Sequence, residues 1–310
     1  MSKITLETPE IEINSQLTDI ENANNLTTDE DYNLDTHLDK IKDHIGFTQT
    51  KVGEMLVYRL DSIVSHCLAL YGEYTDAEAV IMSHYLTPES IYIDIGTNIG
   101  YHALAVNKYA GCAVQGFEPH PTHFAMAAYN CRDKPIRIYN TALSNFNGSI
   151  KMTKFDVTTQ GNYGEACLDE ENGIDVPVIT LDDVINDFPR VDVMKVDVEG
   201  FECEVLEGGR NTIEKFRPVI LFEANVIEFW EPCCEFLENY QYKFYWVTCK
   251  SKPIGPTFKE SDENPFGDYG VSNILAVPIE KPQPDDLVPV QRGQNFNDLL
   301  NKIKKYKFIF

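Results

Sequence analysis

Three charged residues alternate with apolar ones in the segment Lys195-Val-Asp197-Val-Glu199. On a regular β-strand, residues two positions apart point to the same face. The spacing therefore predicts that the lysine and the two acids share one face. Such charges are costly to bury unless they are paired. Their presence on an otherwise apolar segment favours a functional site over a purely structural ion-pair network.

The chemistry that these side chains suit is the activation of a weak nucleophile. An acid can take the proton of an alcohol at neutral pH. Asp197 beside Lys195 would stay ionised but would be a weaker base, so two roles stay open: proton acceptor, or a group that orients a cofactor or a substrate hydroxyl. Glu199 stands at the start of the next expected helix, where the helix dipole also favours a negative charge. Glu223, at the end of a later apolar segment, is a second candidate base at the same sheet edge.

Two histidines and a metal site are weighed against this group. His102 and His120 also lie near strand ends, but surface or core positions are the preferred interpretation for both. Acids from two strand ends can bind a divalent ion. No dense set of oxygen ligands is visible in the sequence, so no metal is expected.

A glycine-rich turn follows another apolar segment, in Ile91-Tyr-Ile-Asp94-Ile-Gly96-Thr-Asn98-Ile-Gly100. Glycine lets the backbone approach a ligand closely. Free N–H groups at the start of the next helix suit a carboxylate, and Asp94 suits a cation such as an ammonium group. A ligand with an amino-acid part carries both charges.

Glu118 ends the next apolar segment, in Gly-Phe-Glu118-Pro119. An acid at that place can bind both hydroxyls of a ribose. Nicotinamide and flavin cofactors predict the spacing G-x-G-x-x-G, whereas here the spacing is G-x-x-x-G with Asp94 in front. The two turns together predict S-adenosylmethionine (SAM), with S-adenosylhomocysteine as its product. Ala142-Leu143-Ser144 follows the third strand, where the adenine edge would lie.

The elements that must position these residues alternate regularly. Strands are expected at 91–95, 113–117, 136–139, 191–196, 218–222, 242–248 and 273–277, with helices at 99–109, 124–131, from 200 to 208, and at 227–239. Alternating strands and helices imply right-handed crossovers and a mostly parallel sheet. The fold class is therefore α/β, a doubly wound seven-stranded sheet, in which ligands bind at the carboxyl ends of the strands. Short strands at 149–155 and 176–180 surround a polar loop.

The composition and pattern of the sequence divide the chain into four predicted segments. Residues 1–35 are acidic and predict a flexible arm. Residues 36–88 form a mixed extension that includes a capping box at Thr75-Asp-Ala-Glu78. The catalytic domain is expected at 89–280. Residues 281–310 form a tail with an amphipathic helix, because its apolar residues recur at helical spacing.

The net charge, the apolar runs and the cysteine pattern exclude several classes of partner and protein. The formal net charge of −23 weighs against nucleic acid and anionic membranes as partners. No apolar run is long enough to span a membrane, and the start of the chain lacks the pattern of a signal peptide. The eight cysteines include no C-x-x-C pair. We therefore expect reduced thiols in a cytoplasmic protein and no structural zinc.

At this point the chain resembles the FkbM family of class I SAM-dependent methyltransferases. The matching motifs, in order, are Asp94-Ile-Gly-Thr-Asn-Ile-Gly100, Phe117-Glu118-Pro119, Ala142-Leu143-Ser144, Val178-Ile-Thr-Leu-Asp-Asp183, Lys195-Val-Asp-Val-Glu-Gly200, Leu206-Glu-Gly208 and Phe222-Glu223. The resemblance covers roughly residues 70–280. Thr97 stands where alanine is usual. The candidate cofactor-binding residues are thus Asp94, Gly96, Asn98, Gly100, Glu118, Pro119, Ala142, Leu143 and Ser144.

The resemblance implies methylation of a hydroxyl, on a sugar, a glycan or a glycosylated natural product. The expected partner is such a small-molecule or glycan acceptor, held by segments 158–168 and 250–271. Tyr74, Trp230, Tyr245 and Trp246 are aromatic candidates for a sugar-stacking face, with the core as the alternative. Methylation of a protein or another small molecule, and a non-catalytic SAM-binding subunit, are the alternative functions.

Overall fold

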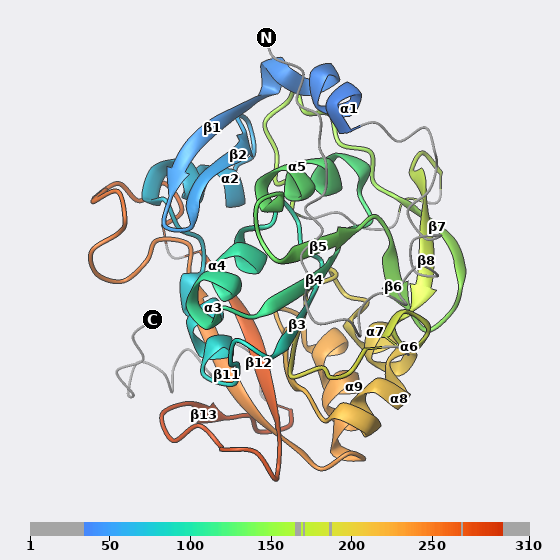
Figure 1. The fold of residues 1–310 in the computed structure, drawn as a ribbon. Helices are drawn as coiled ribbons and strands as arrows, with labels where there is room; N and C mark the ends of the chain where they lie inside the picture. Colours follow the sequence, from blue (N-terminus) through green and yellow to red (C-terminus); the bar gives the residue numbers. More distant parts are fainter. Residues whose placement is uncertain (1–33, 165–168, 170, 186–187, 268, 294–310) are drawn as a thin grey trace.

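An eight-stranded sheet with helices on both faces forms the centre of the computed structural model, which describes residues 34–164, 169, 171–185, 188–267 and 269–293 (Figure 1). Seven of its strands match the sequence prediction: β3 (Ile91–Ile95), β4 (Ala113–Phe117), β5 (Ile136–Tyr139), β9 (Val193–Val196), β10 (Val219–Glu223), β11 (Tyr242–Lys250) and β12 (Gly270–Pro278). The eighth, β13 (Val288–Pro289), adds a short edge strand beside β11 that the sequence did not predict.

The strand order is β13-β11-β12-β10-β9-β3-β4-β5. The five strands from β10 to β5 are parallel, and β12 runs antiparallel to both of its neighbours. The chain thus starts in the middle of the sheet at β3, winds outward through β4 and β5, and returns to build the other half from β9. This confirms the doubly wound, mostly parallel α/β sheet.

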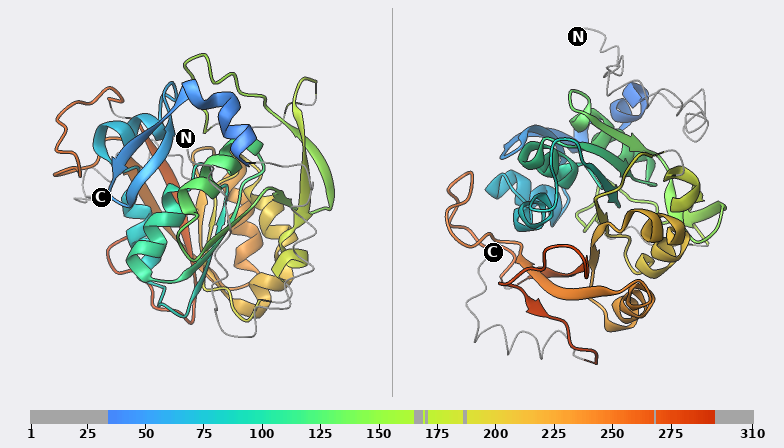
Figure 2. Two further views of the ribbon diagram at one scale, coloured as in Figure 1. Left: turned by 45° about the horizontal axis from the view of Figure 1, so that its top comes forward. Right: turned by 60° about the horizontal axis from the view of Figure 1, so that its bottom comes forward.

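Helices cover both faces of this sheet, and each face buries its own apolar cluster (Figure 2). The helices α3 (Asp76–Ser83), α4 (Tyr101–Ala110) and α5 (Pro121–Cys131) pack on one face. The other face carries α7 (Glu202–Gly208), α8 (Arg210–Phe216) and α9 (Ile227–Glu238), with α6 (Leu181–Ile185) beside them. Parallel strands that are covered on both faces have apolar residues at successive positions rather than alternating ones, as in 219–222 and, except for Asp94, in 91–95.

A second sheet of three strands stands beside the first. It consists of β6 (Ala142–Ser144), β8 (Ile174–Thr180) and β7 (Gly148–Met152), in that order. The predicted short strands near 149–155 and 176–180 are thereby confirmed. The sheet places β6 directly after the end of β5.

The residues before β3 form a compact extension. It contains α1 (Leu34–Ile41), a 3₁₀ turn (Lys42–His44), the hairpin β1 (Ile45–Thr50) and β2 (Gly53–Tyr58), and then α2 (Val64–Tyr71). The helical spacing of Leu38, Ile41 and Ile45 would continue the helix to Ile45, but Ile45 begins β1. The predicted arm up to residue 33 and the C-terminal amphipathic helix from residue 294 lie outside the described residues.

Helix α3 begins where the capping box places it, but the capping box itself does not form. Thr75 has a left-handed backbone (φ 42°) and its side chain caps no backbone N–H of the helix. Its hydroxyl instead lies 3.0 Å from Nε2 of His102. Within the described ranges, no helix has the length and apolar character to cross a membrane.

Candidate active site

A cavity of about 430 Å³ opens at the carboxyl ends of β3, β4, β9 and β10. Its volume falls within the range of small-molecule sites in proteins. The strand ends that surround it are the sheet edge at which doubly wound folds bind ligands. Residues of the predicted site that line it are Gly96, Asn98, Glu118, Pro119, Ala142, Leu143, Ser144, Lys195, Asp197, Glu199 and Glu223.

The glycine-rich turn after β3 forms one wall of this cavity. Gly96 has a φ of +84°, and a Cβ there would lie 1.8 Å from the carbonyl oxygen of Asp197. At Gly100, with a φ of +92°, a Cβ would lie 3.0 Å from Sγ of Cys131. Both glycines are therefore required by the close packing of the protein's own chain segments, not only by the approach of a ligand that the sequence suggested.

Asp94 lies beneath the cavity rather than in its wall. The side chain is 1% exposed, and Oδ1 accepts a hydrogen bond of 2.9 Å from the hydroxyl of Tyr92. Burial raises the pKa of Asp94 to about 6, although the charge of Lys195 acts in the opposite direction. Asp94 is paired with Lys195 in the β3–β9 register, so the two side chains share one face of the sheet. Neither Asp94 nor Gly100 lines the cavity, in contrast to the other expected residues of this turn.

Glu118 reaches the cavity from the end of β4, on the other side of the same turn. Its Oε2 accepts a hydrogen bond of 2.8 Å from the backbone N–H of Asn98, and Oε1 accepts one of 2.9 Å from the backbone N–H of His120. A carboxylate has about four acceptor positions, so both oxygens keep acceptor capacity for a ligand. The two backbone contacts fix the carboxylate in place.

Lys195 and Asp197 form an ion pair in the wall opposite Glu118, with 2.5 Å between Nζ and Oδ2. Burial disfavours the ammonium of Lys195, but the carboxylates of Asp197, Glu78 and Asp94 outweigh it and raise the lysine pKa. The predicted common strand face does not exist as such, because β9 ends at Val196 and Glu199 has a φ of +54°. Lys195, Asp197 and Glu199 nevertheless line the same cavity.

Three carboxylates converge beyond this ion pair. Oxygens of Asp197, Glu199 and Glu223 all lie within 4.8 Å of one another. Burial and the charges of Asp197, Glu199 and Glu202 raise the pKa of Glu223 to about 9. Asn225 donates a hydrogen bond to Glu223. The sequence places these acids at one sheet edge but does not show that their oxygens lie close together. A group of three carboxylates such as this could also hold a divalent ion.

His102 lines the cavity from the first turn of α4, whereas the sequence favoured a surface or core position for it. Its Nε2 lies 3.0 Å from Oγ1 of Thr75 and 3.7 Å from Oε2 of Glu78. Burial, followed by the charge of Lys195, lowers the pKa of this imidazole. In the sequence, only the position of His102 two residues after Gly100 indicates that it could reach the cavity. His120, in contrast, caps α5 by accepting a hydrogen bond from the backbone N–H of Thr122, as its structural interpretation required.

Two segments far apart in the sequence are joined where they cover the cavity. The backbone N–H of Ser62 donates to the carbonyl of Gly161 at 2.8 Å, and Gly161 donates to the carbonyl of Leu60 at 3.3 Å. Next to this bridge, Ile63, Val64, Asn162 and Gly164 line the cavity. The expected acceptor segment 158–168 thus contributes through its described part, and segment 250–271 contributes Tyr269 and Val271.

Of the four aromatic residues proposed for a sugar-stacking face, one lines the cavity and three are buried in the core. Tyr74 lines the cavity. Trp230 and Trp246 are buried against each other at right angles, with ring centroids 5.4 Å apart. Tyr245 is also buried, with its hydroxyl donating to Gln283. Trp230 and Tyr245 are therefore core residues, as is Trp246, and only Tyr74 is available to a ligand.

The sheet and the cavity define the class of the protein. Numbered in chain order within the sheet, the seven main strands lie in the order 6-7-5-4-1-2-3, with strand 7 antiparallel. This is the doubly wound, mostly parallel arrangement that the sequence predicted. Residues 94–244 match the sequence family described as Methyltransferase FkbM domain. This segment of the chain is thus similar to FkbM methyltransferase domains.

Several known proteins are similar to parts of this chain. The hexuronic acid methyltransferase AglP of Haloferax volcanii is 29% identical over 137 residues, which cover 43% of this chain and 55% of AglP. The methyltransferase sdnD of Sordaria araneosa is 29% identical over 177 residues, 45% of this chain and 66% of sdnD. The match thus spans between about half and two thirds of each relative. The crystal structure of methyltransferase FkbM from Methylobacillus flagellatus KT is 15% identical, with a TM-score of 0.42, over 61% of this chain and 44% of that one.

Proposed function

We propose that this methyltransferase uses SAM to methylate a hydroxyl group of a sugar, a glycan or a glycosylated small molecule. One observation carries the proposal: Glu118 and Asp197 line a single cavity from the two strands that flank β3, with the glycine-rich turn between them. Glu118 suits a ribose, and Asp197 suits an acceptor hydroxyl. The cavity thus offers places for both reactants of a methyl transfer.

The residues present fit the cofactor. The fixed carboxylate of Glu118 can accept hydrogen bonds from both ribose hydroxyls. The first turn of α4, whose Tyr101 and His102 line the cavity, offers backbone N–H groups to the amino-acid carboxylate, whereas those of Gly96, Thr97 and Asn98 are already bonded within the protein. Ala142, Leu143 and Ser144 provide a mainly apolar wall for the adenine. When bound, SAM supplies the methyl group on a positively charged sulfur.

Asp197 is the proposed proton acceptor. Its carboxylate accepts a hydrogen bond from the acceptor hydroxyl and takes the proton as the new C–O bond forms and the C–S bond breaks. Lys195 remains protonated because its pKa is raised, so it holds Asp197 in place and does not act as a base. Glu223, with a pKa of about 9, is protonated at neutral pH and acts as a hydrogen-bond donor. Such positioning is what an in-line displacement requires.

The acceptor class rests on the cavity wall and on one relative. Tyr74 offers an aromatic face on which a sugar ring can pack, and AglP is by name a methyltransferase of a hexuronic acid. The cavity is lined by several carboxylates, and its lysine is already paired with Asp197. Repulsion between like charges disfavours an acceptor carboxylate there, so a neutral sugar is the favoured acceptor.

Two measurements test the proposal. Saturation with SAM at about 100 times its Kd should stabilise the protein by roughly 2.7 kcal/mol, seen as a rise in Tm. NAD serves as the control ligand. A rise with NAD but none with SAM or S-adenosylhomocysteine would exclude the cofactor assignment. Methyl transfer from labelled SAM to neutral sugars, uronic acids, sugar nucleotides and amines then tests the acceptor. A preference for the amines over all hydroxyl compounds would contradict the proposal.

A further inference from the structure

Glu78 lies behind the cavity, on a helix that precedes the matched domain. It belongs to α3, whereas the family match begins at residue 94. Its side chain is 2% exposed. A buried carboxylate is costly unless it interacts with other polar groups, so its surroundings are informative.

The groups around Glu78 come from one helix, four strands and the segment before α3. On one side are Thr75 and Tyr74 before α3, and His102 of α4, whose Nε2 lies 3.7 Å from Oε2 of Glu78. On the other are Lys195 of β9 and Asp197 after it. Glu78 also interacts with Asn273 of β12, Tyr92 of β3 and Cys249 of β11. Lys195 is the one permanent cation among these groups.

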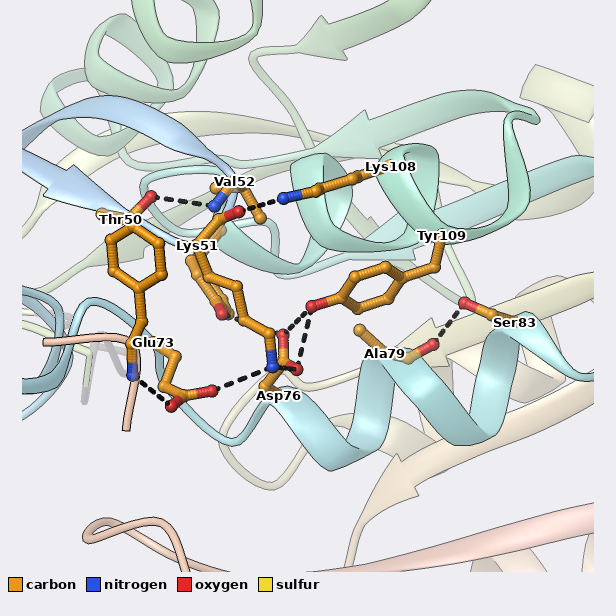
Figure 3. Close-up of polar contacts among 11 residues, drawn as sticks. Thr50, Lys51, Val52, Glu73, Asp76, Ala79, Ser83, Lys108 and Tyr109 are labelled. Atoms are coloured by element: carbon orange, nitrogen blue, oxygen red, sulfur yellow. Dashed lines mark hydrogen bonds and ion pairs between the residues drawn. The ribbon is translucent and has the colours of Figure 1, made fainter. Parts of the chain in front are cut away.

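A network of polar contacts around Asp76 holds the start of helix α3 in place (Figure 3). Asp76 accepts hydrogen bonds from the hydroxyls of Tyr101, at 2.9 Å, and Tyr109, at 2.7 Å, both from α4. Lys51, in the turn between β1 and β2, lies 2.7 Å from Oδ2 of Asp76 and 3.2 Å from Oε2 of Glu73. Asp76 thus fixes the start of α3 on α4, and the helix places Glu78 beside His102 and close enough to Lys195 for the two charges to interact.

We propose that Glu78 is a positioning residue for methyl transfer: its buried carboxylate lies beside the imidazole of His102, attracts the ammonium of Lys195 without forming an ion pair with it, and thereby sets the direction in which Asp197 faces the acceptor. The inference rests on the proposed function, because it takes Asp197 as the residue that meets the acceptor hydroxyl. Without the charge of Glu78, the ammonium of Lys195 is drawn more strongly to Asp197. The carboxylate of Asp197 is then less free to accept a proton.

The protonation of Glu78 gives this role a pH dependence. Burial raises its pKa to about 7, although Lys195 acts in the opposite direction. Above that pH the carboxylate is ionised and balances Lys195, and below it the carboxyl is neutral. The turnover number should therefore rise with pH through about 7.

The variant Glu78→Gln tests the inference. We expect kcat at pH 8 to fall by roughly 10-fold, the scale of one lost hydrogen bond to a charged group, with the KM for SAM within about twofold. The rise of kcat near pH 7 should disappear, which a merely structural role would not cause. Glutamine is neutral, as is the form of Glu78 that burial favours, so the variant should fold. Glu78→Asp keeps the charge and should retain a rise of kcat with pH.

Glu73→Gln is the matched control. It removes a buried carboxylate from the same segment, but one that faces Lys51 and the backbone N–H of Phe258 instead of the cavity. Its pH profile should match that of the wild type. An unchanged kcat and pH profile in Glu78→Gln would overturn the inference. A rise of kcat near pH 7 that persists in this variant would also overturn it and would point to Glu202, whose pKa is also about 7. If the wild type neither binds SAM nor transfers methyl groups, the proposed function itself is wrong, whatever the Glu78 variants show.

Discussion

Nζ of Lys195 lies 2.5 Å from Oδ2 of Asp197, and the ammonium also interacts with the carboxylates of Glu78 and Asp94. One buried cation therefore offsets the negative charges of three acids, which come from β3, α3 and the end of β9. Breaking a buried pair by removing one partner leaves uncompensated charge, which is more costly than never having formed the pair.

The first prediction concerns this cation. Lys195→Met should lower the free energy of unfolding by about 3–5 kcal/mol at pH 8, because the three carboxylates lose their counter-charge. Urea denaturation followed by circular dichroism measures the change. Lys243→Met, at an exposed position on β11, should stay within about 0.5 kcal/mol of the wild type. Equal midpoints for the two variants would show that Lys195 does not stabilise the acids.

Glu118→Gln tests the proposed ribose contact. The carboxylate accepts hydrogen bonds from two backbone N–H groups, and the amide of glutamine would turn a donor toward one of them. The Kd for SAM should rise by roughly 10- to 100-fold, as expected for the loss of hydrogen bonds to a charged group. Isothermal titration calorimetry gives the Kd. Glu54→Gln, on the exposed part of β2, is the control, and an unchanged Kd in Glu118→Gln would exclude this residue from the site.

Gly96→Ala should destabilise the protein and abolish SAM binding. The added Cβ would lie 1.8 Å from the carbonyl oxygen of Asp197, and the φ of +84° is unfavourable for alanine. The turn after β3 would have to move away from the end of β9. Thermal denaturation and SAM titration report the two effects. Gly148→Ala, whose Cβ would make ordinary contacts with Phe146, should behave like the wild type.

Glu223 should limit stability at high pH. Its pKa in the folded protein is about 9, above the value of about 4.3 for an unfolded chain. The folded state therefore binds the proton more strongly, and the stability that this provides is lost as the pH rises through 9. In Glu223→Gln the free energy of unfolding should fall less between pH 7 and pH 10. Because the wild-type carboxyl is protonated at pH 7, kcat there should change little. A collapse of kcat at pH 7 would instead identify Glu223 as the base.

Methyl transfer should survive removal of divalent ions. Asp197, Glu199 and Glu223 form the group that could hold a metal. The protonated form of Glu223 and the nearby ammonium of Lys195 already reduce the repulsion between these acids. We therefore expect full activity after dialysis against a chelator. Loss of activity that Mg²⁺ or Mn²⁺ restores would contradict this and make the three carboxylates a metal site.

Sequence reasoning predicted what depends on local pattern. The alternation of apolar strands and amphipathic helices gave all seven main strands, and the turns after β3 and β4 predicted residues that do line the cavity. Helix α8 was missed, because Gly208-Gly209 was interpreted as a stop. Gly209 has a φ of −108° rather than a left-handed conformation, so a new helix follows at once.

What the sequence could not predict depends on contacts between distant segments. Thr75 has the position and type of a helix cap, yet its hydroxyl lies near His102 in the folded chain. Nothing near Glu78 in the sequence indicates a lysine on β9 as its neighbour. The hairpin β1–β2 was equally ambiguous, because its short apolar runs fit a strand or a helix.

The bridge between Leu60–Ser62 and Gly161 has a consequence for engineering. It joins, beside the cavity, a segment that precedes the domain matched by the family model and a loop between two strands of the second sheet. A change of acceptor preference made in one segment alone would leave the other with mismatched backbone hydrogen bonds. Redesign, or exchange with a relative, would have to transfer both segments together. A truncated version starting at residue 89 would lose part of the cavity wall and many apolar residues of the cluster on one face of the sheet.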